Sequence, residues 1–196
     1  MKLVINNAVD IDTFNLENIK ANSHQAIKNN GKKKVGYIGT ISGWVQVDLI
    51  FQVAKERKDI DFYFIGPIEA GLNIDMEKRP DNVIFTGTQP YYEIPTILKQ
   101  LDVTIMPFEK SKLIESVNPV KIYEYLSLGK PVIATRYEET EKFGDVIYTY
   151  GDKEEFMYQL EKSLQETGNM NDIRIKYARE NSWESRVEHI RKMLKL

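Results

Sequence analysis

The sequence predicts an α/β fold in which a parallel sheet of about six strands is covered by helices on both faces. Two observations predict it. Short apolar runs alternate along the chain with longer amphipathic segments, as in successive strand–helix–strand units. Glycine and proline concentrate just after the apolar runs, where strands end and the chain turns.

The first 34 residues are expected to lead into this sheet. Residues 1–14 indicate a short apolar strand followed by a polar turn, and residues 15–34 show almost no periodicity, which indicates an irregular connector. The basic run at 32–34 is interpreted as a solvated lead-in to the first main strand and not as a binding patch.

From residue 35 onward the expected elements follow in a regular order. The strands are expected at 35–39, 60–65, 82–85, 103–106, 131–135 and 146–148. The helices are expected at 44–57, 93–100, 119–128, 153–166, 170–180 and 182–196, with Ser182 as the N-cap of the last. Pro119 is expected just inside the start of the third helix and Gly129 just past its end. This order predicts a Rossmann-like three-layer sandwich.

The composition limits the functions that the chain can have. Its 196 residues, of which 42% are hydrophobic and 29% charged, can form one domain with a sizeable core. The net charge of -2 gives no reason to expect a nucleic-acid partner. Because there is no cysteine, thiol nucleophiles, disulfides and Cys-ligated metals are excluded. No apolar run approaches the roughly 18 residues of a membrane span, so the chain is expected to be cytoplasmic.

Several other candidate motifs carry little weight. The two histidines, His24 and His189, fall in a connector and in the last helix, so neither a metal pair nor a catalytic base is expected. Neither a Walker loop nor a G-x-G-x-x-G motif occurs. The acidic residues Glu138, Glu139 and Glu141 are interpreted as a solvated turn.

The clearest candidate site is the helix that carries Lys121 and Glu124. These residues are three positions apart, so both project from one side of the helix. Near a helix N-terminus, where the backbone dipole favours anions, a lysine can pair with diphosphate oxygens. A carboxylate one turn later can accept hydrogen bonds from two ribose hydroxyls. The plain alternative is an exposed ion pair worth a few tenths of a kcal/mol.

The segment NPVKIYEYLSLGKPVIAT closely resembles the donor-site helix of GT-B glycosyltransferases of the family 4 type (group 1). Other segments resemble the same C-terminal, donor-binding half in the right order. VINNAVDIDTF resembles the link that enters this half, VGYIGTIS its first strand and glycine loop, and FYFIGP and NVIFTGTQPYYEIPTILKQLDVTIMPF the strands that follow. The resemblance spans nearly the whole chain. It implies a link and lead-in at residues 1–30 and a donor-binding domain at 31–196.

The resemblance also implies roles for individual residues. Glu124 matches the glutamate that binds the donor ribose, and Lys121, Asn118 and Pro119 match positions beside the diphosphate and the sugar. Gly39 and Thr40 match the loop under the diphosphate. Thr88 and Tyr91 match the loop beside the base. Lys121 is the expected catalytic group because it would stabilise the leaving diphosphate.

The family motif is not fully kept. The first glutamate of the E-x7-E motif would fall on Ser116, and Glu115 lies one position further from Glu124. Either Glu115 reaches the donor sugar as a second catalytic residue, or Ser116 holds that place and the contact is lost. The Arg and Lys that often follow the first strand are also missing, which would leave the charge compensation to Lys121, with Lys110 or Lys112 as helpers.

The resemblance implies the nucleotide-sugar-binding half of a retaining glycosyltransferase, most simply one that uses a UDP-sugar, with no metal or other cofactor. The expected partners are the donor and an N-terminal acceptor-binding half outside this chain, so the chain alone would transfer little sugar. Peripheral membrane association of a longer parent enzyme stays open. Two alternatives were a UDP-sugar epimerase of the same fold and a non-catalytic signalling domain. The second would need an acidic cluster after the first strand, and GTISGW has none.

Overall fold

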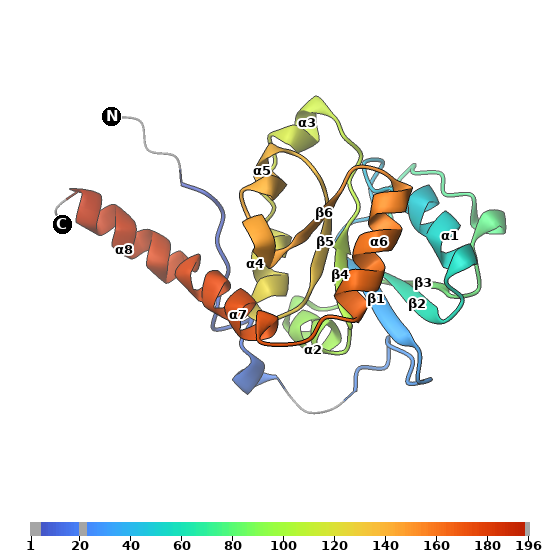
Figure 1. Ribbon diagram of the computed structural model, residues 1–196, viewed down its shortest axis with the longest axis horizontal. Helices are drawn as coiled ribbons and strands as arrows, with labels where there is room; N and C mark the ends of the chain where they lie inside the picture. The colour runs from blue at the N-terminus through green and yellow to red at the C-terminus, as the bar shows by residue number, and fades with distance from the viewer. Residues whose placement is uncertain (1–4, 20–22, 195–196) are drawn as a thin grey trace.

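A computed structural model of the protein describes residues 5–19 and 23–194. Its centre is a six-stranded sheet in the order β3-β2-β1-β4-β5-β6 (Figure 1). Every neighbouring pair of strands is parallel, so the predicted parallel α/β sandwich is confirmed.

The strands lie close to their predicted positions. They are β1 (Lys33–Ile38), β2 (Ile60–Ile65), β3 (Val83–Gly87), β4 (Val103–Met106), β5 (Val132–Thr135) and β6 (Tyr148–Tyr150). Every residue of β2, β4 and β5 is buried, which fits a sheet covered on both faces. The prediction for the last strand was wrong by two residues, because Gly144–Val146 forms a 3-10 turn (η4) that delays the strand.

The longer helices also agree with the sequence. They are α1 (Val47–Glu56), α2 (Ile94–Lys99), α4 (Val120–Ser127), α6 (Lys153–Leu164), α7 (Met170–Glu180) and α8 (Trp183–Leu194). Ser182 caps α8 as expected, since its hydroxyl accepts a hydrogen bond from the Ser185 N–H at 3.2 Å. Three further 3-10 turns lie at Leu16–Asn18 (η1), Met76–Lys78 (η2) and Tyr91–Glu93 (η3).

The helices form a layer on each face of the sheet. α1 and α6 contact each other and cover one face, while α4 packs on β5 and against α7 on the other (Figure 1). The end of α2 is joined to the start of β5 by Lys130, whose ammonium donates to the carbonyls of Lys99 and Leu101 at 2.7 and 2.6 Å. Burial lowers the pKa of this lysine to about 8.

Two local predictions around α4 need correction. Pro119 has extended backbone angles and stands at the N-cap, so it precedes the helix instead of lying just inside it. The polar segment before it contains a short helix, α3 (Lys112–Glu115). The acidic run is not a solvated turn but the short helix α5 (Glu138–Glu141), and the Glu139 side chain is only 18% exposed. The Glu139 carboxylate accepts hydrogen bonds from Asn118 and Lys142. The contact with Asn118, which is distant in the sequence, is not revealed by sequence spacing.

The N-terminal segment lies along the α7–α8 turn. Val9 forms an isolated parallel bridge with Ser182, and Ala8 and Val9 are fully buried. The strand predicted near the N-terminus falls largely on residues 1–4, which are outside the described range. Ile5–Ala8 is not assigned to a strand.

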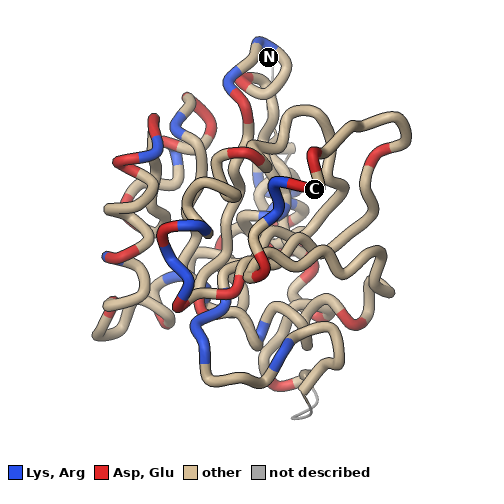
Figure 2. The backbone as a smooth tube through the Cα atoms, turned by 90° about the vertical axis from the view of Figure 1, so that its right-hand side faces the viewer, with Lys and Arg blue, Asp and Glu red and all other residues tan. Residues whose placement is uncertain are grey.

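The surface carries mixed charges. On the face drawn in Figure 2, Lys and Arg are interspersed with Asp and Glu along the chain. Among residues 5–19 and 23–194, the longest helices are too short and too polar to cross a bilayer.

Candidate functional site

A cleft of about 450 Å³ opens at the carboxyl ends of β1 and β4. These strands are neighbours, but the chain continues from β1 to β2 on one side and from β4 to β5 on the other. The cleft therefore lies at the switch in strand order, where open parallel sheets bind ligands. Four of the predicted site residues line it: Thr40, Asn118, Pro119 and Lys121.

Lys121 lies directly against the backbone of Gly39. A Cβ atom on Gly39 would be only 2.3 Å from Lys121 Cε and 3.0 Å from its Nζ. Gly39 also has a φ of 148°, in the region that favours glycine. The ammonium group is thus held over the loop that follows β1, at the mouth of the cleft.

The N-terminus of α4 points its backbone N–H groups at the same region. Pro119 cannot cap them, and α4 has no side-chain cap among the residues that the structure describes. By contrast, Ser111 caps α3 and Asp152 caps α6. First-turn N–H groups that no side chain caps, together with the helix dipole and Lys121, make an anion site.

Glu124 lies one turn further along α4, beside Tyr91 from the loop after β3. Burial raises the pKa of the Glu124 carboxyl, while the Lys121 ammonium and the Tyr91 hydroxyl act in the opposite direction. Burial and the Glu124 charge together raise the pKa of Tyr91 to about 12. The Tyr91 ring packs edge-to-face on Phe14, with centroids 5.8 Å apart. A half-buried carboxylate beside a cation is a functional-site feature.

Asn118 makes contacts that the sequence did not suggest. Its side-chain oxygen accepts from the Asn7 N–H at 2.9 Å, and its amide nitrogen donates to Glu139 at 2.9 Å. Its own backbone carbonyl accepts from Asn7 Nδ2 at 2.6 Å. Direct contact of Asn118 with a ligand therefore stays a prediction, and its established contacts are to the N-terminal segment and α5.

The other predicted residues lie around the cleft without lining it. Thr88 is exposed in the loop after β3. Glu115 and Ser116 are exposed at the end of α3, and the Ser116 hydroxyl donates to the Leu113 carbonyl at 2.7 Å.

An apolar wall of the cleft was missed by the sequence interpretation. It is formed by Tyr37, Met106, Phe108, Leu113, Ile114 and Val117. Trp44 is 38% exposed and lines the cleft as well. The one available signal was Leu113, an apolar residue in a polar segment, which is 62% exposed.

Within the part of the chain that is described, no group of three or more His, Asp or Glu side chains is placed to hold a metal ion.

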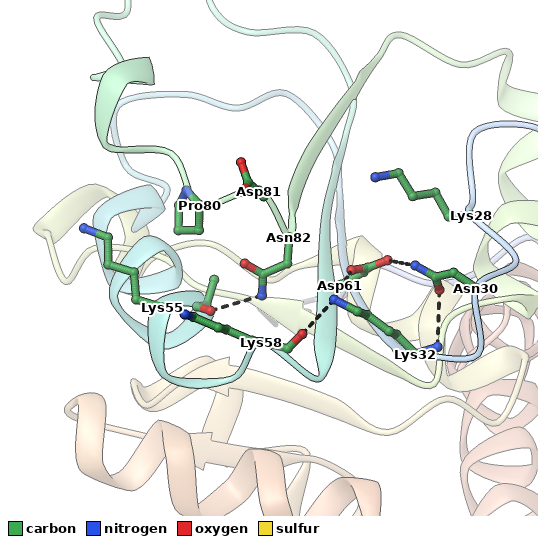
Figure 3. Close-up of a pocket in the computed structure, with 10 residues that line it drawn as sticks. Lys28, Asn30, Lys32, Lys55, Lys58, Asp61, Pro80, Asp81 and Asn82 are labelled. Carbon is green, nitrogen blue, oxygen red and sulfur yellow. Dashed lines mark hydrogen bonds and ion pairs between the residues drawn. The ribbon is translucent and has the colours of Figure 1, made fainter.

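A larger cavity, of about 590 Å³, lies at the opposite end of the sheet (Figure 3). Its buried polar residues, Asn82 and Asp61, already have partners in the protein. The Asn82 amide nitrogen lies within 3.1 Å of the Ala54, Arg57 and Ile60 carbonyls, and Asp61 accepts from Asn30 at 2.7 Å. Its lysines surround the C-terminus of α1, where the helix dipole favours cations. These contacts stabilise the fold, so the switch-point cleft is the better candidate.

The chain is similar to known proteins in sequence and in fold. A protein of Bacillus subtilis (strain 168) named "Putative teichuronic acid biosynthesis glycosyltransferase TuaH" is 28% identical over 196 residues, covering 96% of this chain and 49% of that protein. Anabaena HepE in complex with UDP and glucose has a TM-score of 0.72 at 16% identity, covering 98% of this chain and 56% of that one. A glycosyltransferase from Rickettsia africae ESF-5 gives 0.75 at 14% identity, covering 98% and 57%.

The structural neighbours establish the GT-B type of fold, and the chain spans about half the length of the relatives that it matches. The family description "Glycosyl transferases group 1" matches residues 32–166, most of the described domain. This chain therefore belongs to the group 1 glycosyltransferases.

Proposed function

We propose that this chain is the nucleotide-sugar-binding half of a retaining glycosyltransferase and that it binds a UDP-sugar in the switch-point cleft. The observation that carries the proposal is the Lys121 ammonium, held over Gly39 at the uncapped N-terminus of α4. The family of the chain supports sugar transfer, and the HepE structure, described as a complex with UDP and glucose, supports a uridine nucleotide as donor.

The geometry suggests a division of roles. The diphosphate would lie between the glycine loop after β1 and the N-terminus of α4, where Lys121 and the helix dipole oppose the negative charge that develops as the diphosphate leaves. Glu124 would accept hydrogen bonds from the ribose hydroxyls, and Tyr91 and Thr88 would flank the base. Because the chain itself supplies the positive charge, the proposed reaction needs no metal.

Two further proposals concern the contact to the donor sugar and the binding of the acceptor. Glu115, or Ser116 in its place, would contact the sugar from the end of α3. Since the chain spans about half of its relatives, we expect it to bind the donor alone and to transfer sugar only together with an acceptor-binding half.

Replacing Glu124 with alanine should weaken UDP binding about tenfold or more, because hydrogen bonds to a charged group contribute about 1.5–3 kcal/mol. Isothermal titration calorimetry with UDP measures this directly. Wild-type protein that binds no UDP at millimolar concentration, or equal affinity in Glu124→Ala, would contradict the assignment.

The pH dependence gives a second readout of the same carboxylate. The ribose hydroxyls need the charged form of Glu124, whose pKa burial raises. Binding of UDP-glucose should therefore be full above that raised pKa and should fall as the pH drops through it, at a higher pH than for an ordinary glutamate. UDP-glucose suits this test because both of its phosphates are esterified. The decline should be absent in Glu124→Gln.

A further inference from the structure

The N-terminal segment is tied to the residue that immediately precedes the N-cap of α4. Asn7 donates two hydrogen bonds to Asn118, from its N–H to Asn118 Oδ1 and from its Nδ2 to the Asn118 carbonyl. The second bond is short, at 2.6 Å, and fixes a backbone carbonyl only three residues before Lys121. Movement of Asn7 would thus act directly on the backbone that leads into the anion site.

The same segment is held on its other side by the turn between α7 and α8. The Val9 N–H donates to the Asn181 carbonyl at 3.3 Å, and the Trp183 N–H donates to the Val9 carbonyl at 3.1 Å. Arg186 of α8 approaches the Asn7 carbonyl at 3.4 Å. Figure 1 shows the N-terminal segment and α8 extending from the same side of the sheet. Two segments that leave the sheet domain therefore meet next to α4.

Asn118 is anchored a second time, on the side away from the N-terminal segment. Its amide donates to Glu139 of α5, and Lys142 is paired with the same carboxylate. The Lys142 ammonium, followed by the Asn118 amide, lowers the pKa of Glu139, which keeps this carboxylate charged. Glu139 lies outside the residues that line the cleft.

We infer that Asn118 is a positioning residue that couples the N-terminal segment and the start of α8 to the diphosphate-binding end of α4. This inference rests on the proposed function of the cleft. Asn118 would act through its contacts with Asn7 and Glu139. These contacts would hold the first turn of α4 in the position that places Lys121 against Gly39. Donor binding and the placement of residues 7–9 are then linked, so that each stabilises the other.

The charge of Glu139 permits a selective test by titration with UDP. In Asn118→Asp, the new carboxylate still accepts from the Asn7 N–H but faces Glu139, so UDP affinity should fall about tenfold. In Asn118→Asp with Glu139→Gln, the repulsion is removed, and affinity should return to within about threefold of the wild type.

A matched pair of variants covers the case in which Asn118→Asp does not fold. Glu139→Ala and Glu139→Gln remove the same charge, but only glutamine can still accept from the Asn118 amide. UDP affinity should therefore be about threefold lower in Glu139→Ala than in Glu139→Gln.

Hydrogen exchange at residues 7–9 supplies a second readout, because a defect confined to the cleft would not change the exchange rates of these amides. Saturation with UDP should slow exchange of the Val9 amide in the wild type and in Glu139→Gln, and much less in Glu139→Ala. Wild-type UDP binding with unchanged affinity in Asn118→Asp and Glu139→Ala would overturn this inference alone. Loss of affinity in Asn118→Asp without rescue by Glu139→Gln would also overturn it and would favour direct contact with the donor. A wild type that does not bind UDP would instead refute the proposed function itself.

Discussion

Replacing Lys121 with methionine is expected to weaken UDP binding about 30-fold, which corresponds to about 2 kcal/mol for a lost charge-assisted contact to phosphate. Methionine keeps most of the apolar stem that packs against Gly39, so the change removes the charge and leaves the packing. The effect should be large because the cleft is lined mainly by apolar side chains, with Lys121 as the one basic residue among the described residues that line it. Calorimetric titration of the variant with UDP measures the loss.

Lys55→Met is the matched control for this prediction. Lys55 is an exposed lysine in the last turn of α1, at the opposite end of the sheet from the cleft. Its replacement changes the net charge by the same amount and should leave UDP affinity within about twofold, because exposed charges beyond about 10 Å are screened at ordinary salt. Equal losses in the two variants would mean that Lys121 acts only through the overall charge of the protein.

Replacing Gly66 with alanine is expected to lower the free energy of unfolding by about 3–5 kcal/mol, since backbone strain and a clash act together. Gly66 has a φ of 144°, and a Cβ atom there would lie 2.2 Å from the Gly39 carbonyl oxygen. The clash is with backbone at the carboxyl ends of β1 and β2, so no side chain can rotate away. For a chain of this size, the melting temperature should fall by roughly 10 °C or more.

Gly71→Ala separates the clash from the backbone effect. Gly71 also has a positive φ, of 84°, but a Cβ atom there would meet nothing within 4 Å. We expect this variant to lose only about 1 kcal/mol, the ordinary cost of a left-handed non-glycine residue. Thermal unfolding of both variants tests the difference. Similar melting temperatures would show that the close approach of Gly66 to the Gly39 carbonyl relaxes easily.

The sheet was predictable from the sequence because its signals are local. Apolar runs bounded by glycine and proline gave the bounds of β2 and β4 to the residue. The position of β6 was not predictable in the same way, because the 3-10 turn at Gly144–Val146 takes up Val146, the first residue of the apolar run that was expected to form the strand. The helix α5 was missed because its hydrogen bonds to residues far away in sequence, above all Asn118 to Glu139, decide its burial.

The candidate site was only partly predictable. Lys121 and Gly39 were identified by their resemblance to the family motif, and the structure brings them into contact. The apolar wall of the cleft was missed, because residues such as Tyr37 and Phe108 look like ordinary core residues in sequence. Family membership excludes the alternative of a signalling domain. The partners of Asn118 come from residues 7 and 139, and no local pattern connects them.

The strand order has a consequence for how the protein folds. The cleft needs β1 beside β4, and these strands pair only after the chain has passed through α1, β2, β3 and α2. Contacts between residues so distant in sequence form slowly, because the intervening chain must first be ordered. We therefore expect an early folding intermediate built on β1, β2 and β3 to have no affinity for UDP. Stopped-flow refolding with a fluorescent UDP derivative should show binding only in the slowest folding phase; binding in a faster phase would contradict this order of assembly.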